Sequence, residues 1–257
     1  MRLELMTTGA VAAHIARTPG IIVPVGSTEQ HGPDGLIGTD HLCPEVIARR
    51  AGERHGWLIA PTLAYGMSQF HLGFPGTIAL RPSTLTALAL DIIASLAATG
   101  FKRIYILNGH GGNVGPLRSA VHEYYAPRSY AGEIVPTSVH CRLRSWWELP
   151  TTDALRKALY GPAEGYHATP SEVAITMAAH PESIQPFERA APRSPVAGDV
   201  MIHAGDNYYD AADFRARFPD GRVVSHSALA RPEDGERLIE AAVADLGEDF
   251  AAFLAAS

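Results

Sequence analysis

The sequence predicts a layered α/β/α fold with a mostly parallel central sheet, built as a single domain over residues 1–257. Short apolar segments rich in β-branched residues alternate along the chain with longer segments that carry apolar residues at helical spacing. A polar, Gly-rich turn follows one of the apolar segments, which is where open parallel sheets bind their ligands. A chain of 257 residues that is 46% hydrophobic can also bury one large core.

The first part of the chain predicts two strands with a helix between them. Ile21–Val25 and Trp57–Ala60 are short apolar runs typical of buried strands. The intervening segment His41–Arg54 has helical spacing, and Thr39 or Asp40 can supply its N-cap. We therefore expect a strand, a helix and a second strand in this order.

A second helix and strand follow. Thr84–Thr99 carries an apolar stripe, with Ser83 as the expected N-cap and Gly100 at its C-terminal end. The next strand, Arg103–Leu107, leads directly into the polar turn Asn108–Asn113.

The remaining chain predicts one strand and three helices, in the order Ile134–His140, Ala154–Leu159, Pro170–Ala179 and Leu238–Leu254. Thr169 is the expected N-cap of the middle helix. The stretch Ile184–Gly221 is rich in Pro, Asp and Arg and has little periodicity, so we expect a long excursion that covers the site or meets another subunit.

Composition excludes several classes of function. A net charge of -6 and a pI near 6.0 provide no basic surface for a phosphate backbone, so we expect a small-molecule substrate rather than a nucleic acid. Two cysteines are too few for a disulfide framework, and no apolar run reaches the ~20 residues that span a membrane. Met1–Ala13 lacks the features of a signal peptide, so we expect a cytoplasmic protein.

The first chemical cluster follows the first strand. Glu29 and His31 point to the same side if the chain stays extended, because side chains alternate in a strand. Asp40 follows a Gly-containing loop that can return it to the same place. Asp40 as a simple N-cap and His31 as a turn residue is an equally acceptable interpretation of this cluster alone.

The second cluster is the turn Asn108–Asn113. Glycines on both sides of His110 let the backbone approach a bound ion closely, while the imidazole projects into the cleft. A phosphate-binding loop is the alternative, but the glycine spacing is not that of a dinucleotide-binding turn.

The third cluster contains His167 and Glu172. Thr169, Pro170 and Glu172 have the spacing of a capping box, which taken alone is the stronger interpretation of Glu172. A metal-binding role for Glu172 gains support only in company with the other two clusters.

Together these motifs resemble the creatininase family. The resemblance rests on Glu29-Gln-His31-Gly-Pro, Thr-Asp40-His, Phe74-Pro-Gly-Thr77, Asn108-Gly-His110-Gly-Gly-Asn113 and His167 with Glu172, in that order. It covers residues from about 20 to 180. It implies a layered α/β fold, a binuclear metal centre, hydrolysis of cyclic or linear amides and assembly as a homo-oligomer, commonly a hexamer.

The resemblance also implies roles for single residues. Glu29 and His110 correspond to ligands of one metal, His31 to a ligand of the other, and Asp40 to the bridge between them. Creatininase has a further carboxylate where this chain has Gly112, and Glu172 is the nearest substitute. The negative charges of Glu29, Asp40, Glu172 and one hydroxide would together neutralise two divalent ions. Because all the ligands are imidazole or carboxylate, we expect zinc first, with manganese or iron as alternatives.

The implied reaction is attack of metal-activated water on an amide, with His167 as the proton donor for the leaving nitrogen. Creatininase encloses its substrate with aromatic residues at positions that are Gly111 and Ala163 here, so creatinine is an unexpected substrate. Trp146 or Trp147 can provide one aromatic wall. We therefore expect an amidohydrolase for bonds other than peptide bonds, with formamide, peptide or lactone hydrolysis as alternatives.

A different class of function is a doubly wound nucleotide-binding module in which the histidines are incidental. Metal content separates the two hypotheses, because only the hydrolase requires about two divalent ions per chain.

Overall fold

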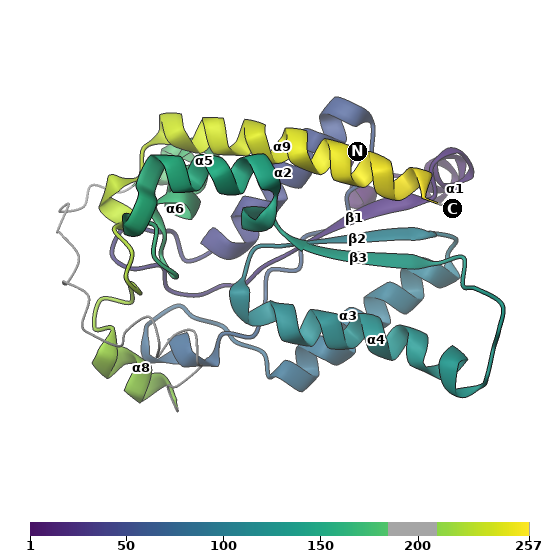
Figure 1. Ribbon diagram of the computed structural model, residues 1–257, viewed down its shortest axis with the longest axis horizontal. Helices are drawn as coiled ribbons and strands as arrows, with labels where there is room; N and C mark the ends of the chain where they lie inside the picture. Colours follow the sequence, from purple (N-terminus) through teal and green to yellow (C-terminus); the bar gives the residue numbers. More distant parts are fainter. Residues whose placement is uncertain (185–209, 257) are drawn as a thin grey trace.

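A computed structural model describes residues 1–184 and 210–256, and its core is a parallel sheet between two helical layers (Figure 1). The sheet contains β1 (Gly20–Val25), β2 (Arg103–Asn108) and β3 (His140–Ser145), hydrogen-bonded in that order. The helices among the described residues are α1 (Thr8–Arg17), α2 (Thr39–His55), α3 (Pro82–Ala98), α4 (Val114–Tyr130), α5 (Pro150–Tyr160), α6 (Pro170–Ala179), α8 (Ala211–Arg217) and α9 (Pro232–Ala255). Short 3-10 turns connect several of them, including η2 (Gln69–Gly73), η3 (Gly111–Asn113) and η4 (Trp146–Glu148).

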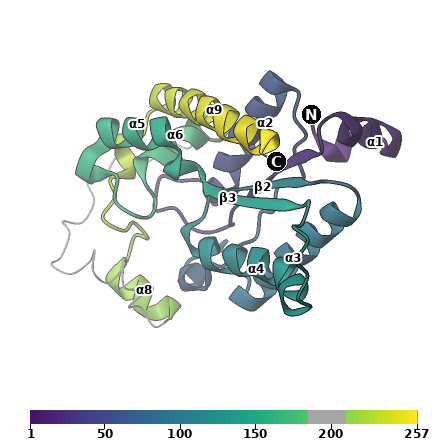
Figure 2. The ribbon, with the colours of Figure 1, turned by 45° about the vertical axis from the view of Figure 1, so that its right-hand side comes forward.

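Alternating residues of the strands feed two separate cores. Ile22 of β1 packs with α2 and α9 on one face, whereas Ile21 and Val23 pack with α3 and α4 on the other. Figures 1 and 2 show the two helical layers from different sides, with α2, α5, α6 and α9 on one face and α3 and α4 on the other. Because both faces are covered, β1 is buried along its whole length, as parallel strands require. The predicted fold class is confirmed.

The sheet register determines where the site forms. Val25 lies opposite Asn108, and Asn108 lies opposite Ser145. The carboxyl ends of all three strands therefore share one edge, and the chain segments after each strand emerge side by side.

Two predicted strands differ from the structure. The prediction of a strand at Ile134–His140 is wrong, because β3 begins only at His140. Ile134 and Val135 are 95% and 72% exposed, so their β-branched side chains have no buried face to join. Trp57–Ala60 lies beside β1 through an isolated parallel bridge between Ile59 and Ile22, without becoming a full strand of the sheet.

Several helix boundaries also differ from the predictions. α2 begins at Thr39 after Gly38, so neither Thr39 nor Asp40 is its cap. α3 begins at Pro82 after Arg81, because proline suits the first helical position better than Ser83 suits the cap. α5 and α9 start earlier than expected, also at prolines.

Other elements were not predicted at all. The pattern did not predict α1 or α4, and α4 has a weak apolar stripe and contains Pro127. Within the expected excursion Ile184–Gly221, residues 185–209 lie outside the described residues, and 211–217 form α8. Among the described residues, no helix combines the length and apolar character needed to cross a membrane.

Candidate metal centre

Two glycines bring the start of α2 against the strand ends. A Cβ atom at Gly26, after β1, would lie 2.3 Å from the backbone oxygen of Asp40, and one at Gly109, after β2, would lie 2.0 Å from it. Only glycine permits both approaches. Asp40, in the first turn of α2, is consequently held between the ends of two neighbouring strands.

Asp40 contacts histidines on both sides. Its Oδ1 lies 3.0 Å from Nε2 of His31, and its Oδ2 lies 3.0 Å from Nδ1 of His110. Glu29 Oε1 lies 3.4 Å from the same His110 nitrogen. All four side chains are buried, so the first two sequence clusters meet in one place.

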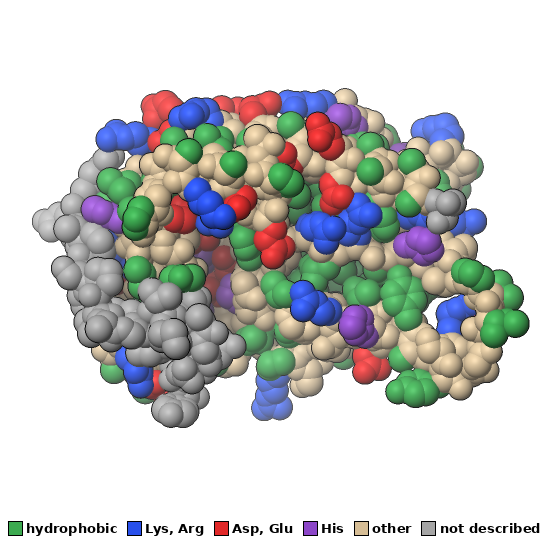
Figure 3. Space-filling model, in the orientation of Figure 1, with side chains coloured by type: hydrophobic (Ala, Val, Ile, Leu, Met, Phe, Trp, Pro, Cys, Tyr) green, Lys and Arg blue, Asp and Glu red, His purple; other side chains and the backbone are tan. Residues whose placement is uncertain are grey.

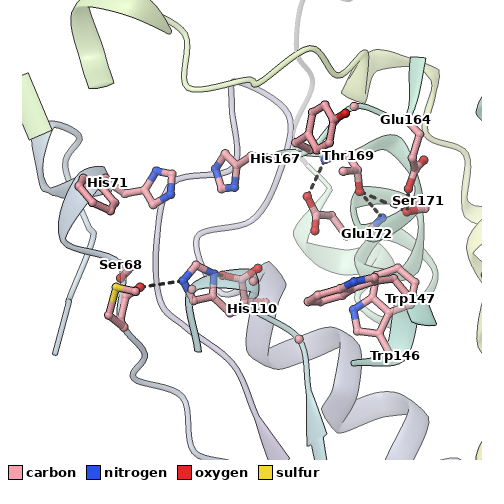
Figure 4. A pocket seen from close by; sticks show the side chains of 18 of the residues that line it. Ser68, His71, His110, Trp146, Trp147, Glu164, His167, Thr169, Ser171 and Glu172 are labelled. Atoms are coloured by element: carbon pink, nitrogen blue, oxygen red, sulfur yellow. Dashed lines mark hydrogen bonds and ion pairs between the residues drawn. The ribbon is translucent and has the colours of Figure 1, made fainter. Parts of the chain in front are cut away.

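Glu172 reaches this place from α6. Its Oε1 accepts a hydrogen bond from the Thr169 backbone N–H at 2.5 Å, and the Thr169 hydroxyl accepts one from the Glu172 N–H at 3.3 Å (Figure 4). The expected capping box is therefore present. The same Oε1 lies 3.9 Å from Nε2 of His31, so capping and membership of the cluster coexist in one side chain.

Three overlapping groups have the geometry of a metal site. In each, one ligand atom per residue lies within 4.8 Å of the others, and the groups are Glu29–Asp40–His110, His31–Asp40–Glu172 and Glu29–His31–His167. Asp40 is shared by the first two groups. All five residues expected to bind metal from the sequence are thus brought together, and His167 lies beside them.

The histidines are oriented as metal ligands are. His31 Nδ1 lies 3.0 Å from the Glu29 carbonyl oxygen, and His110 Nε2 lies 2.9 Å from that of Met67. A ring N–H donated to each carbonyl leaves the other nitrogen directed at the carboxylates, where it can bind an ion once it gives up its proton. This is the second contact that ligating histidines almost always make.

The carboxylates also fit a cation. Both oxygens of Glu29 and Oδ2 of Asp40 are buried and accept no hydrogen bond of ordinary geometry from the described residues. An unsatisfied buried carboxylate is costly, and a divalent ion removes that cost. Imidazole and carboxylate donors suit zinc, manganese or iron, so the residues present fit the expected ions.

Burial and mutual charge shift the cluster's ionisation. Burial, together with the nearby Asp40 carboxylate, raises the pKa of Glu29 to about 8. Burial would lower the pKa of His31 and His110, but the surrounding carboxylates outweigh it and raise these pKa values to about 10 and about 9. Burial opposes ionisation of Asp40, yet the two histidines hold its pKa well below its usual range. The carboxylates of the cluster therefore stabilise positive charge placed between them, which the protonated histidines carry in this structure.

His167 differs from the other histidines. Its Nε2 lies 2.8 Å from the Gln30 backbone oxygen, and its Nδ1 lies 3.7 Å from Glu29 Oε1. Burial and the neighbouring histidines lower its pKa well below the usual value. The following residue, Ala168, has a φ of 55°, a left-handed conformation that non-glycine residues rarely adopt. His167 is therefore a neutral imidazole held in a strained turn.

A cleft of about 590 Å³ adjoins the cluster. Figure 3 shows acidic and histidine side chains in a hollow of this face. Trp146 and Trp147 form the wall opposite His71 and His167 (Figure 4). Gly111 lines the cleft, and a Cβ atom there would meet no atom of residues 1–184 or 210–256 within 4 Å, so these residues leave this side open.

Position 112 cannot supply a carboxylate in this backbone. A Cβ atom at Gly112 would lie 2.5 Å from the Met67 carbonyl oxygen and 2.6 Å from His110 Nε2. The contact between Met67 and His110 fills the space where a side chain would begin. Glu172 is the carboxylate that completes the second group instead.

The glycine loop has little capacity for a phosphate. The His110 N–H donates to Asn108 Oδ1 at 3.1 Å, and the Asn113 N–H donates to the His110 carbonyl at 3.1 Å. Two of the backbone donors that could cradle a phosphate are therefore used within the loop.

His71 is a member of the site that the sequence analysis missed. It lies on η2, is buried, and has its Nε2 3.2 Å from Glu29 Oε1. Its position just before the Phe74–Thr77 motif was the available signal, but a lone histidine on an unpredicted turn carries little weight.

Comparison with known proteins agrees with the fold and the cluster. The family model described as creatininase, creatinine amidohydrolase, matches residues 4–250. This chain belongs to the creatininase family. It is similar to the creatinine amidohydrolase of Pseudomonas putida, with 29% identity over 240 residues that cover 89% of this chain and 87% of the relative.

A second kind of relative is a peptidase. The mycofactocin precursor peptide peptidase of Mycobacterium ulcerans (strain Agy99) is 41% identical over 123 residues, which cover 44% of this chain. The match spans about half of that relative, 49% of its length.

Solved structures of creatininase share the whole fold. A structure of creatinine amidohydrolase superposes with a TM-score of 0.81 and 26% identity, covering 100% of this chain and 98% of the other. One described as a manganese creatininase has a TM-score of 0.78 and 26% identity, covering 99% of both chains. A zinc–zinc form of a creatininase variant is also similar, with a TM-score of 0.80.

Proposed function

We propose that this chain is an amidohydrolase that uses two divalent metal ions to hydrolyse a small amide other than creatinine. The observation that carries the proposal is Asp40, whose two carboxylate oxygens face His31 on one side and His110 on the other. Shared by two ligand groups, it has the placement of a bridging ligand. Glu29 and His110 would hold one ion, and His31 and Glu172 the other.

Two divalent metal ions bound here would supply Lewis acidity that activates water and polarises the substrate carbonyl. The protein's own residues then handle protons and position. His167, neutral because of its lowered pKa, can accept a proton at Nδ1 and return it to the leaving nitrogen. The contact between its Nε2 and the Gln30 carbonyl keeps the ring in that orientation.

The open cleft wall supports a substrate other than creatinine. Gly111 and Ala163 stand where creatininase has aromatic residues, and no side chain in the described part of the chain lies within 4 Å of a Cβ atom built at Gly111. Trp147, which is only partly buried, can still pack against an apolar part of the substrate, whereas Trp146 behind it is 1% exposed and belongs to the core. We propose a C–N bond other than a peptide bond as the target.

Peptide hydrolysis is the second candidate. A cleft of about 590 Å³ can hold more than a small ring, and the peptidase relative is 41% identical over its aligned segment. The zinc preference, the cytoplasmic location and the hexamer expected from the sequence stay predictions.

A metal assay and a substrate screen test these proposals together. Protein purified, stripped and reloaded should bind about two divalent ions per chain, measured by elemental analysis. The loaded protein should then hydrolyse members of a panel of cyclic amides, formamides, lactones and short peptides, and chelator should abolish turnover. Absence of bound metal after reloading would refute the function, whereas cleavage confined to peptides would select the second candidate.

A further inference from the structure

His71 is held by aromatic contacts on both sides. Its ring stacks on His167 with centroids 4.3 Å apart and an interplanar angle of 24°, and it meets Phe214 edge-on at 4.7 Å. The side chain is 10% exposed. The ring plane is therefore fixed before any ligand binds.

Gln30 determines which nitrogen of His71 carries the proton. The Gln30 Oε1 accepts a hydrogen bond from the Gly32 N–H at 2.9 Å, which turns the amide nitrogen toward the histidines. That nitrogen lies 2.8 Å from His71 Nδ1, 2.9 Å from His167 Nε2 and 3.2 Å from the Gly221 carbonyl oxygen. The amide has two hydrogens to donate, and His167 Nε2 uses its own hydrogen for the Gln30 backbone oxygen at 2.8 Å. His71 Nδ1 and the Gly221 carbonyl are therefore the acceptors, and His71 Nε2 bears the hydrogen.

This arrangement is the opposite of that at the candidate ligands. His31 and His110 each face a backbone carbonyl with one nitrogen, which frees the other nitrogen for an ion. His71 faces an amide N–H instead, so its inward nitrogen is a donor and cannot coordinate a cation.

The inward N–H is directed to Glu29. His71 Nε2 lies 3.2 Å from Glu29 Oε1, nearer than His110 Nδ1 at 3.4 Å or His167 Nδ1 at 3.7 Å. The Oε1 atom is not aligned as a regular hydrogen-bond acceptor, so the contact is a close electrostatic one. A partial positive charge at this distance still restrains the orientation of the carboxylate.

We propose that His71 is a positioning residue that fixes Glu29 for metal binding, with Gln30 setting the His71 tautomer. This inference rests on the proposed metal centre. Under this proposal, η2 controls the affinity for the ion that Glu29, Asp40 and His110 would hold, although no predicted motif includes η2.

Two substitutions distinguish the effect of the His71 N–H from the effect of ring packing. His71→Phe keeps a ring for the stack on His167 but removes the donor, whereas His71→Gln restores an amide N–H near the position of Nε2. A matched control is His14→Phe, because His14 is also buried, at 3% exposed, but lies on α1 away from the cluster. Thermal unfolding of the metal-free proteins reports any general packing effect.

Cobalt(II) titration, followed by visible absorbance and by competition with a chelator, measures each binding step without a substrate. Loss of an outer-shell partner of a metal ligand typically lowers affinity by about 10–100-fold. We expect His71→Phe to weaken one of the two steps by about tenfold or more. The affinity of the other step in His71→Phe should stay within about threefold of wild type, well below that outer-shell effect. Both affinities of His71→Gln and of His14→Phe should also stay within about threefold of wild type.

Three outcomes would overturn the inference. Unchanged affinity in His71→Phe would show that Glu29 needs no restraint from η2. Equal losses in His71→Phe and His71→Gln would assign the effect to ring packing or direct coordination rather than to the N–H. Equal losses in His71→Phe and His14→Phe would make it a general effect of replacing a buried histidine. A wild-type protein that binds no cobalt would instead refute the proposed function.

Discussion

Replacing Glu172 by Gln should affect the metal-free and metal-loaded protein in opposite directions. Burial, followed by the repulsion from Asp40, raises the pKa of Glu172 from 4.5 to about 7 even though the charge of His31 favours ionisation. An ionised Glu172 is therefore an unfavourable group in the metal-free fold. Gln keeps an oxygen for the Thr169 N–H, so the helix cap survives the change.

The magnitude follows from linkage. At about 1.36 kcal/mol per pKa unit, the rise from 4.5 to about 7 corresponds to roughly 3 kcal/mol of lost stability above pH 7. The stabilising contribution of the protonated carboxyl is present below pH 4.5 and is lost as the pH rises through about 7. We expect metal-free Glu172→Gln to be up to about 3 kcal/mol more stable than wild type at pH 8, and equally stable near pH 4.

The assay is thermal or urea unfolding of chelator-treated proteins across this pH range, combined with metal titration. A gain of this size corresponds to several degrees in Tm for a chain of this length. With metal present the order should reverse, because Gln lacks the charge and donor strength of a carboxylate. Binding of the ion held by His31 and Glu172 should weaken, and turnover should fall with it.

The opposite result is equally clear. A metal-free Glu172→Gln variant that is no more stable than wild type at pH 8 would refute the argument from the raised pKa of Glu172, because burial raises that pKa whether or not the carboxylate binds an ion. If Glu172 is only a cap, the variant should keep its affinity for both ions. Wild-type metal stoichiometry and turnover in that variant would leave the second ion's last ligand unidentified.

Asp40→Asn should contain neither ion when its metal content is measured by elemental analysis. The metal-free variant should also have a lower Tm than metal-free wild type at pH 7, because a carboxylate whose pKa is lowered in the fold stabilises it at pH values above its usual pKa. Full metal content would refute the bridge. His167→Asn should keep both ions while turnover falls by about 10²–10⁴-fold; loss of an ion would make His167 a ligand, as its group with Glu29 and His31 allows. Light scattering under active conditions should give a multiple of 27.5 kDa, with a hexamer expected, and a mass of one chain would contradict the predicted assembly.

The sequence predicts the site better than it predicts the elements around it. Glu29, His31 and His110 lie in short motifs that follow strands, and the parallel register brings the ends of those strands together. Asp40 joins them from the first turn of α2. Glu172 required the resemblance, because its local pattern is fully explained by the cap that the structure also contains.

The missed features depend on contacts between distant segments. Ile134 and Val135 have strand-like side chains, but the sheet pairs with residues from His140 onward, and only the fold decides that register. His71 gains meaning only from Gln30 and Glu29, which lie about forty residues earlier in the chain. No local periodicity reports such a contact.

The two glycines beside Asp40 have a consequence for metal supply. Because the chain at Gly26 and Gly109 lies directly against the backbone of Asp40, the backbone of this candidate ligand keeps its place without an ion to hold it. Under the proposed function, the centre can lose one divalent ion and accept another without rebuilding the fold. The identity of the bound metal would then follow the metals that the cell makes available, and the same polypeptide could work with zinc under one growth condition and manganese under another.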